Sequence, residues 1–211
     1  MLIVVAGMPG AGSSTVIQRG LEMLRHMRSS DAEAVEKSEE ASERAEFVHL
    51  NYGDVMFEIA SQEGIINRDQ IRKLPHETQT LIQKKACRRI ADMSKDANIV
   101  LDTHCTIKTP FGYLPGLPAD VLHELSPRLF VLIEAFPHEI ARRRKTDKTR
   151  MRDEEAEEDI AEHQAMNRAI SMAYACLTGA PVKIIENHDG EIEKAAREFA
   201  ETVMKLHTLQ H

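Results

Sequence analysis

Residues 7–15 read GMPGAGSST and follow the apolar run LIVVA at residues 2–6. The next stretch, VIQRGLEMLRHM, has apolar side chains at helical spacing. A strand, a glycine-rich turn and a helix in this order are typical of a phosphate-binding loop. Backbone N–H groups of such a loop point at one anion, and the N-terminus of the following helix adds a favourable dipole. Three glycines give the backbone the freedom that this geometry needs.

One position departs from the usual pattern, because Ser13 stands where lysine normally reaches the outer phosphates. Ser14 occupies the Ser/Thr position, whose hydroxyl can ligate Mg²⁺. The glycine spacing favours phosphate binding over a structural turn. Without the lysine, other features of the chain must decide between the two interpretations.

Four further strand-sized apolar runs occur along the chain, and helical patterns separate them; with the first run they cover residues 2–6, 47–50, 98–101, 128–134 and 182–185. Continuous rather than alternating hydrophobicity indicates strands that are buried on both faces of a parallel sheet. The order of the elements predicts an α/β fold with right-handed crossovers and helices on both faces. A ligand is then expected at the carboxyl ends of the strands.

Composition excludes several classes of function. The formal net charge of −7 disfavours a nucleic-acid binder, which needs a basic surface. Cys87, Cys105 and Cys176 have no ligand-type spacing, so we expect neither disulfides nor a zinc site, and a cytoplasmic location. The opening apolar run is too short for a signal peptide or a membrane span, and we expect no membrane partner.

Two segments between the predicted strands are distinctive. Residues 29–46 hold seven acidic and two basic residues and almost no large apolar side chain. A solvated insertion explains this composition better than an acidic helix that binds a partner. Residues 153–180 predict one long helix, with acidic residues at its start and Gly179 near its end. Its expected core positions are Ile160, Met166, Ile170, Ala173 and Leu177.

Two features make phosphate binding the favoured interpretation of the glycine loop. Asp102 ends the third apolar run, beside the loop in the predicted sheet, and suits a Mg²⁺ site reached through water. Residues 142–153, RRRKTDKTRMRD, contain seven Lys or Arg residues within an otherwise acidic chain. Arginine grips phosphate in a bidentate manner, so this segment can supply the charge that Ser13 lacks.

The chain resembles the archaeal-type adenylate kinases of the P-loop nucleoside-monophosphate kinase superfamily. The resemblance spans nearly the whole chain apart from residues 29–46, and DTHCTIKTPFGYLPGLP at residues 102–118 is its most specific block. The other matching stretches are GMPGAGSST, NYGDVMFEIA, RDQIRKL, TRMRD, EHQAMNR and LTGAPVKII. Members that resemble this chain also lack lysine at the Ser13 position.

The resemblance implies the reaction Mg·ATP + AMP ⇌ 2 ADP, with Mg²⁺ as the cofactor. It implies a P-loop NTPase-type five-stranded parallel sheet in one domain, residues 1–211, with small AMP-binding and lid segments. Residues 53–95 would cover AMP, and residues 145–153 would form a short lid over ATP. Relatives of this group form trimers, so we expect a homo-oligomer.

The resemblance also assigns candidate site residues. ATP would contact Gly7, Met8, Pro9, Gly10, Ala11, Gly12, Ser13, Ser14 and Thr15. The transferred phosphoryl group would be stabilised by Arg143, Arg144, Arg150 and Arg152. Mg²⁺ would be met by Ser14 and, through water, by Asp102. AMP would contact Gly53, Asp54, Arg72, Thr103, His104 and Lys108.

Several alternatives remain open from the sequence. Phe57 stands where more familiar adenylate kinases have an arginine, so Arg72 and Lys108 are only candidates for the AMP-phosphate ligand. His104 and His163 can equally be structural hydrogen-bonding residues. The nearest alternative function is a kinase of UMP, CMP or a deoxynucleotide, since few hydrogen bonds decide the base. A non-catalytic module that binds ATP is the third.

Overall fold

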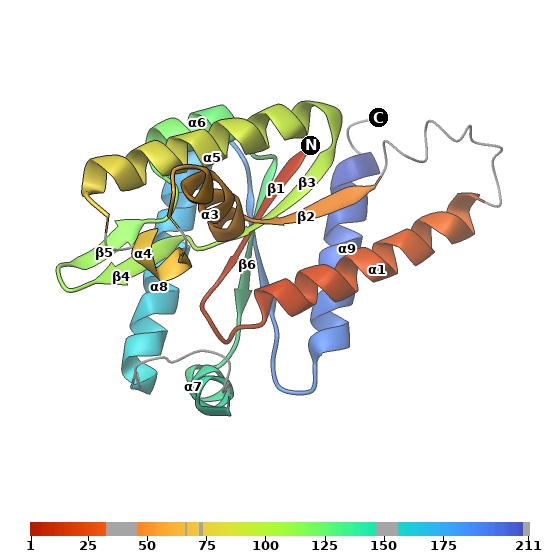
Figure 1. The fold of residues 1–211 in the computed structure, drawn as a ribbon. Helices are drawn as coiled ribbons and strands as arrows, with labels where there is room; N and C mark the ends of the chain where they lie inside the picture. Colours follow the sequence, from red (N-terminus) through yellow and green to blue (C-terminus); the bar gives the residue numbers. More distant parts are fainter. Residues whose placement is uncertain (33–45, 66, 72–73, 147–155, 209–211) are drawn as a thin grey trace.

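The computed structural model describes residues 1–32, 46–65, 67–71, 74–146 and 156–208. A five-stranded parallel sheet forms the centre, in the order β2-β3-β1-β6-β7 (Figure 1). Its strands are β1 (Leu2–Gly7), β2 (Phe47–Asn51), β3 (Asn98–Thr103), β6 (Leu129–Glu134) and β7 (Val182–Glu186). The sequence predicted all five strands of this sheet, and the predicted α/β class is confirmed.

The three central strands explain why hydrophobic runs predicted this fold. Every residue of β1, β3 and β6 is buried, because helices cover both faces of the sheet. Along β1 the side chains alternate between two separate cores: Leu2 and Val4 belong to one, Ile3 and Val5 to the other. A parallel sheet therefore buries both sets of side chains at once.

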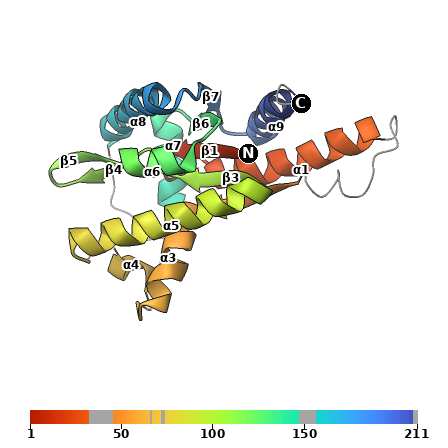
Figure 2. The same ribbon diagram turned by 90° about the horizontal axis from the view of Figure 1, so that it is seen from above.

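Helices on the two faces complete three layers (Figure 2). One face is covered by α1 (Ser13–Ala32) and α9 (Ile192–Thr208), which pack closely against each other. A Cβ atom on Gly20 would lie 2.5 Å from Phe199 Cδ1, so glycine permits this close contact. The other face is covered by α5 (His76–Asp96), α6 (Ala119–Leu125) and α8 (Glu157–Thr178).

Three shorter helices lie near the carboxyl ends of the strands. Directly after β2 comes α3 (Tyr52–Gln62), and the side chain of Asn51 caps it by accepting a 3.2 Å hydrogen bond from the Asp54 N–H. The short α4 (Arg68–Ile71) follows, and α7 (Pro137–Thr146) comes after β6. These helices place parts of residues 53–95 and the start of residues 145–153 at one end of the sheet.

A two-stranded hairpin, β4 (Thr106–Thr109) and β5 (Gly112–Pro115), follows β3 and was not among the predicted strands. It is fixed to α8 by buried polar contacts: Thr106 Oγ1 donates to Asn167 Oδ1 at 2.5 Å, and Tyr174 Oη donates to the Cys105 carbonyl at 2.8 Å. A Cβ on Gly116 would lie 1.9 Å from the His104 carbonyl oxygen, so only glycine fits there.

The predicted core face of α8 is confirmed at Ile160 and in part at Ile170, and it is wrong at Met166, Ala173 and Leu177. Ile160 is buried, and Ile170 is partly buried, but Met166 and Leu177 are 38% and 47% exposed. The buried face instead contains polar residues that bind the hairpin, among them Asn167. Helical spacing identified an apolar stripe but did not tell which side of the helix faces the sheet. We call the exposed apolar side of this helix the outer face of α8; it comprises Met166, Ala169, Met172, Ala173, Cys176 and Leu177.

Two predicted segments lie partly outside the described residues. The acidic stretch 29–46 begins within α1, and its residues 33–45 are not described. The predicted lid begins at the end of α7, and its residues 147–153 are not described. Within the described ranges, no helix is both long and apolar enough to cross a membrane.

Candidate active site

The glycine loop joins β1 to α1 at the carboxyl end of the sheet, where the sequence predicted a ligand. Gly10 and Gly12 have φ angles of +97° and +86°, a region that favours glycine over other residues. The Ala11 N–H donates to the Met8 carbonyl at 2.8 Å and closes the turn. Met8 and Ala11 are buried, so their side chains fix the loop and leave its backbone to face a ligand.

Two of the predicted arginines contact this loop from α7. Arg144 Nε donates to the Pro9 carbonyl at 2.6 Å, and Arg143 Nη1 donates to the Gly10 carbonyl at 3.3 Å. Arg143 also forms an ion pair with Asp189, Nη2 to Oδ1, at 2.7 Å. The structure therefore brings Arg143 and Arg144 to the loop, where they bind its carbonyl oxygens.

Asp102 lies beside the start of α1 because β1 and β3 are neighbours, with Val5 paired to Asp102. Ser14 Oγ donates to Asp102 Oδ2 at 2.6 Å, and Ser13 Oγ donates to Oδ1 at 3.2 Å. Both predicted Mg²⁺ residues are thus in direct contact. Ser13, which replaces the usual lysine, supplies a second hydroxyl to the same carboxylate.

The surroundings of Asp102 favour its charged form. Its burial opposes ionisation, but His49 and the Ser14 hydroxyl, with a smaller contribution from His104, hold the pKa of Asp102 below its ordinary value. His49 Nε2 lies 3.8 Å from Asp102 Oδ2. Sequence reasoning missed His49; a histidine near the end of a predicted strand beside β3 was the available signal.

Four of the predicted AMP residues, Gly53, Asp54, Thr103 and His104, lie at this end of the sheet. Thr103 ends β3 and is buried, and His104 Nδ1 lies 3.2 Å from the Gly7 carbonyl oxygen. Gly53 and Asp54 form the first turn of α3. The imidazole of His104 therefore links the segment between β3 and β4 to the start of the glycine loop.

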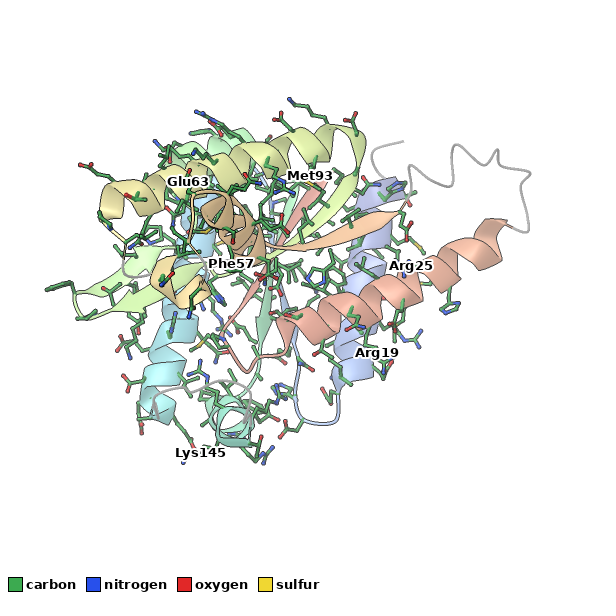
Figure 3. All side chains as sticks on the ribbon, viewed as in Figure 1. Arg19, Arg25, Phe57, Glu63, Met93 and Lys145 are labelled. Carbon is green, nitrogen blue, oxygen red and sulfur yellow. The ribbon has the colours of Figure 1, made fainter. Side chains whose placement is uncertain are left out.

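Phe57 also lies on α3, where it packs against the core and is only partly buried (Figure 3). A phenylalanine side chain has no charge and no hydrogen-bond donor, so it cannot bind a phosphate. If AMP binds beside α3, a lysine or arginine from another segment must bind its phosphate. The first candidate, Lys108, forms an ion pair with Asp159, Nζ to Oδ1, at 3.0 Å. The second, Arg72, lies outside the described residues.

The remaining predicted arginines, Arg150 and Arg152, also lie outside the described residues. Lys145, at the start of the predicted lid, is on α7 below the glycine loop in the view of Figure 3.

Sequence reasoning missed three groups at the end of the sheet. Glu134 ends β6 and accepts hydrogen bonds from Arg168 Nε at 2.8 Å and 3.0 Å. Asn187, directly after β7, donates from Nδ2 to the Ala11 carbonyl at 2.8 Å. Glu139 of α7 binds the segment after Asn187. Each makes its contact with a segment that is distant in the sequence, so only the fold reveals these contacts.

Comparisons with known proteins agree with this geometry. A family model described as an AAA domain matches residues 6–161. Shikimate kinase from Bacteroides thetaiotaomicron has a similar fold, with a TM-score of 0.55, 11% identity, and coverage of 97% of this chain and 98% of that chain. The protein TT1252 from Thermus thermophilus has a TM-score of 0.51 and 14% identity over 98% of this chain and 97% of its own.

Curated relatives are much closer in sequence. The adenylate kinase of Methanopyrus kandleri is 52% identical over 208 residues, which cover 97% of this chain and 98% of the relative. The adenylate kinase of Methanocaldococcus jannaschii is 50% identical over 203 residues, 96% of this chain and 97% of the relative. That of Methanothermobacter thermautotrophicus is 49% identical over 199 residues, 94% of this chain and 96% of the relative. With such identity over nearly its full length, and with the glycine loop in place, this chain belongs to the adenylate kinase family of phosphotransferases.

Proposed function

We propose that this chain transfers the terminal phosphoryl group of Mg·ATP to AMP, reversibly, and yields two molecules of ADP. A phosphate oxygen of AMP attacks the γ-phosphorus as the bond from that phosphorus to the β-phosphate oxygen breaks. No general base is needed, so the protein contributes positioning and charge stabilisation. The observation that best supports this activity is the contact between Ser14 of the glycine loop and Asp102 at the end of β3.

The ATP phosphates are assigned to residues 7–15. Positive φ angles at Gly10 and Gly12 support this assignment, because they let successive N–H groups face one anion. Arg143 and Arg144 contact the loop carbonyls from α7 and so bring positive charge to the loop. They offset part of the charge that a loop lysine supplies in other P-loop proteins.

Mg²⁺ is assigned to the Ser14 hydroxyl and, through water, to the Asp102 carboxylate. Oxygen ligands suit this hard cation, and the low pKa of Asp102 keeps its carboxylate charged. When bound, Mg²⁺ would neutralise charge on the β- and γ-phosphate oxygens. The Ser14 hydroxyl would ligate the cation through an oxygen lone pair, and its hydrogen could still donate to Asp102.

AMP is assigned to the space between α3 and the β3–β4 segment. Gly53 and Asp54 would flank it on one side, and Thr103 and His104 on the other. Arg72 and Lys108 are proposed for its phosphate, with Lys108 released from Asp159 when AMP binds. Residues 145–153, with Arg150 and Arg152, would close over ATP and exclude water, which prevents wasteful hydrolysis.

A panel of nucleoside monophosphates tests this function against its nearest alternatives. A coupled assay with Mg·ATP and AMP, UMP, CMP and dAMP should give the highest kcat/KM with AMP. A preference for a pyrimidine monophosphate would favour a different nucleoside-monophosphate kinase. ATP binding without formation of ADP in a single turnover with AMP would indicate a non-catalytic module instead.

We also propose that the chain forms a homo-oligomer in the cytoplasm, with a trimer as the expected assembly. The outer face of α8 supports association, because Met172 and Leu177 are 57% and 47% exposed. Ile184 of the edge strand β7 is 38% exposed as well. The three cysteines are unpaired, which fits a reducing compartment.

A further inference from the structure

Glu139 on α7 is a buried carboxylate that connects two segments beside the glycine loop. Its residue exposure is 6%. Oε2 accepts the Phe136 N–H at 3.0 Å, which caps the start of α7. Oε1 accepts the Asp189 N–H at 2.8 Å, and Oε2 also lies 2.9 Å from His188 Nδ1. One carboxylate thus fixes both the helix start and the segment 187–189 after β7.

That segment in turn holds the glycine loop. Asn187 Nδ2 donates to the Ala11 carbonyl at 2.8 Å, and a Cβ on Gly12 would lie 2.6 Å from the same nitrogen. Asp189 accepts from Arg143 Nε at 2.8 Å. Arg143 Nη1 then reaches the carbonyls of Gly10 at 3.3 Å and Ala11 at 3.5 Å. Residues 187–189 therefore direct two donors at the loop.

These donors fix the direction of the loop's N–H groups. The described peptide bonds are trans, so a carbonyl and the N–H of the next residue point in opposite directions. Because the Ala11 carbonyl is held by Asn187 and Arg143, the Gly12 N–H points away from them. That is the side on which the loop would bind phosphate.

We propose that Glu139 is a positioning residue for the triphosphate: it holds residues 187–189 against the glycine loop, and Asn187 transmits this constraint to the Gly12 N–H. Glu139 itself does not touch the nucleotide. This role rests on the proposed binding of ATP by residues 7–15. It predicts that changes at Glu139 and Asn187 weaken ATP binding selectively, although the two side chains belong to different segments.

The test uses three variants of the full-length chain. Glu139→Gln keeps the shape but removes the charge, and Asn187→Asp removes the donor to the Ala11 carbonyl. Glu186→Gln is the matched control, because Glu186 also contacts His188, at 3.4 Å from Nε2, but its side chain is exposed at the end of β7. Calorimetric titration with ATP alone and with AMP alone measures each Kd without turnover, and steady-state kinetics measure each KM.

Glu139→Gln and Asn187→Asp should each raise Kd and KM for ATP by about tenfold, the effect of losing one oriented hydrogen bond. Kd for AMP should stay within about twofold of the wild-type value, because AMP is proposed to bind between α3 and the β3–β4 segment, away from residues 187–189. The double variant should bind ATP about as weakly as either single variant, since both changes release the same loop. Glu186→Gln should match wild type in both affinities.

Two results would overturn this role. One is unchanged ATP affinity in a folded Glu139→Gln variant, and the other is equal weakening of ATP and AMP binding, which marks a general structural effect. If Glu139→Gln fails to fold, Asn187→Asp is judged by the same ATP-to-AMP comparison. A wild-type chain that binds no ATP would instead contradict the proposed function, so the two failures are distinguishable.

Discussion

Ser14 Oγ donates a 2.6 Å hydrogen bond to Asp102 Oδ2, although 88 residues separate the two in the sequence. The parallel pairing of β1 with β3 brings them together at the carboxyl ends of the strands. Ser13 donates to the second oxygen of the same carboxylate at 3.2 Å. The first turn of α1 and the end of β3 therefore form one polar unit. We expect changes in this unit to alter catalysis in two ways.

Asp102→Asn should lower kcat by about two powers of ten, because the variant would no longer hold Mg²⁺ firmly where it stabilises charge on the transferred phosphoryl group. The Mg²⁺ concentration that gives half-maximal rate should also rise, because an amide binds this cation more weakly than a carboxylate. Initial rates across a Mg²⁺ series measure both effects. Asp92→Asn is the control, since Asp92 is exposed on α5 and pairs with Lys95. An unchanged Mg²⁺ dependence in Asp102→Asn would remove Asp102 from the metal site.

Replacing Ser13 with the lysine that is usual in this loop should give little gain in activity. Ser13 already contacts Asp102, so a lysine there would pair with that carboxylate and compete with Mg²⁺ for it. Arg143 and Arg144 also bring positive charge to the loop. We therefore expect kcat/KM for ATP to change by less than about tenfold, or 1.4 kcal/mol. A gain of several powers of ten would show that the arginines do not compensate for the lysine.

The centre of the sheet was predictable because β1, β3 and β6 are buried on both faces and leave continuous apolar runs. The glycine loop, Ser14 and Asp102 were predictable because each lies at a strand end or in a local motif. His49, Glu139 and Asn187 were not, because their roles depend on contacts between distant segments. The β4–β5 hairpin was missed because its strands have only four residues each.

The outer face of α8 shows a second reason why the sequence did not predict part of the structure. Spacing predicted that Met166 and Leu177 are core residues, yet both are exposed because Asn167 and Tyr174 face the hairpin and sheet instead. This helix has one apolar stripe and one polar stripe whose side chains are hydrogen-bonded inside the protein. Periodicity alone does not tell which of the two stripes faces the sheet. An apolar surface in this position is expected to be covered by another molecule.

Substitutions on this face should therefore change the oligomeric state. Met172→Glu with Leu177→Glu places two charges on the outer face of α8 and should shift the chain to a smaller species. Stability of the isolated fold should change little, within about 0.5 kcal/mol for each exposed position. Sedimentation velocity measures the mass, with Met93→Glu on α5, where Met93 is 36% exposed, as the control. A wild-type monomer, or an unchanged mass in the double variant, would contradict association through α8.

The contact between His188 and Glu139 should make stability depend on pH. The hydrogen bond to Glu139 raises the pKa of His188 above its ordinary 6.5, and Glu186 adds to the effect while burial opposes it. Burial would raise the pKa of Glu139, but His188 and the Phe136 N–H hold it below its ordinary 4.5, so its carboxylate stays charged above that pH. Protonated His188 therefore stabilises the fold fully below pH 6.5, and this stabilisation is lost as pH rises through the higher pKa of the folded state.

His188→Gln should accordingly lose the most stability, relative to wild type, near pH 6 and progressively less toward pH 9. Urea unfolding of both proteins at intervals across this range gives the difference in free energy of unfolding at each pH. His123→Gln, at an exposed position on α6, should show no such trend. A difference that stays constant or grows with rising pH would mean that the imidazole packs on the Phe136 ring, 4.0 Å between ring centroids, without contributing its charge.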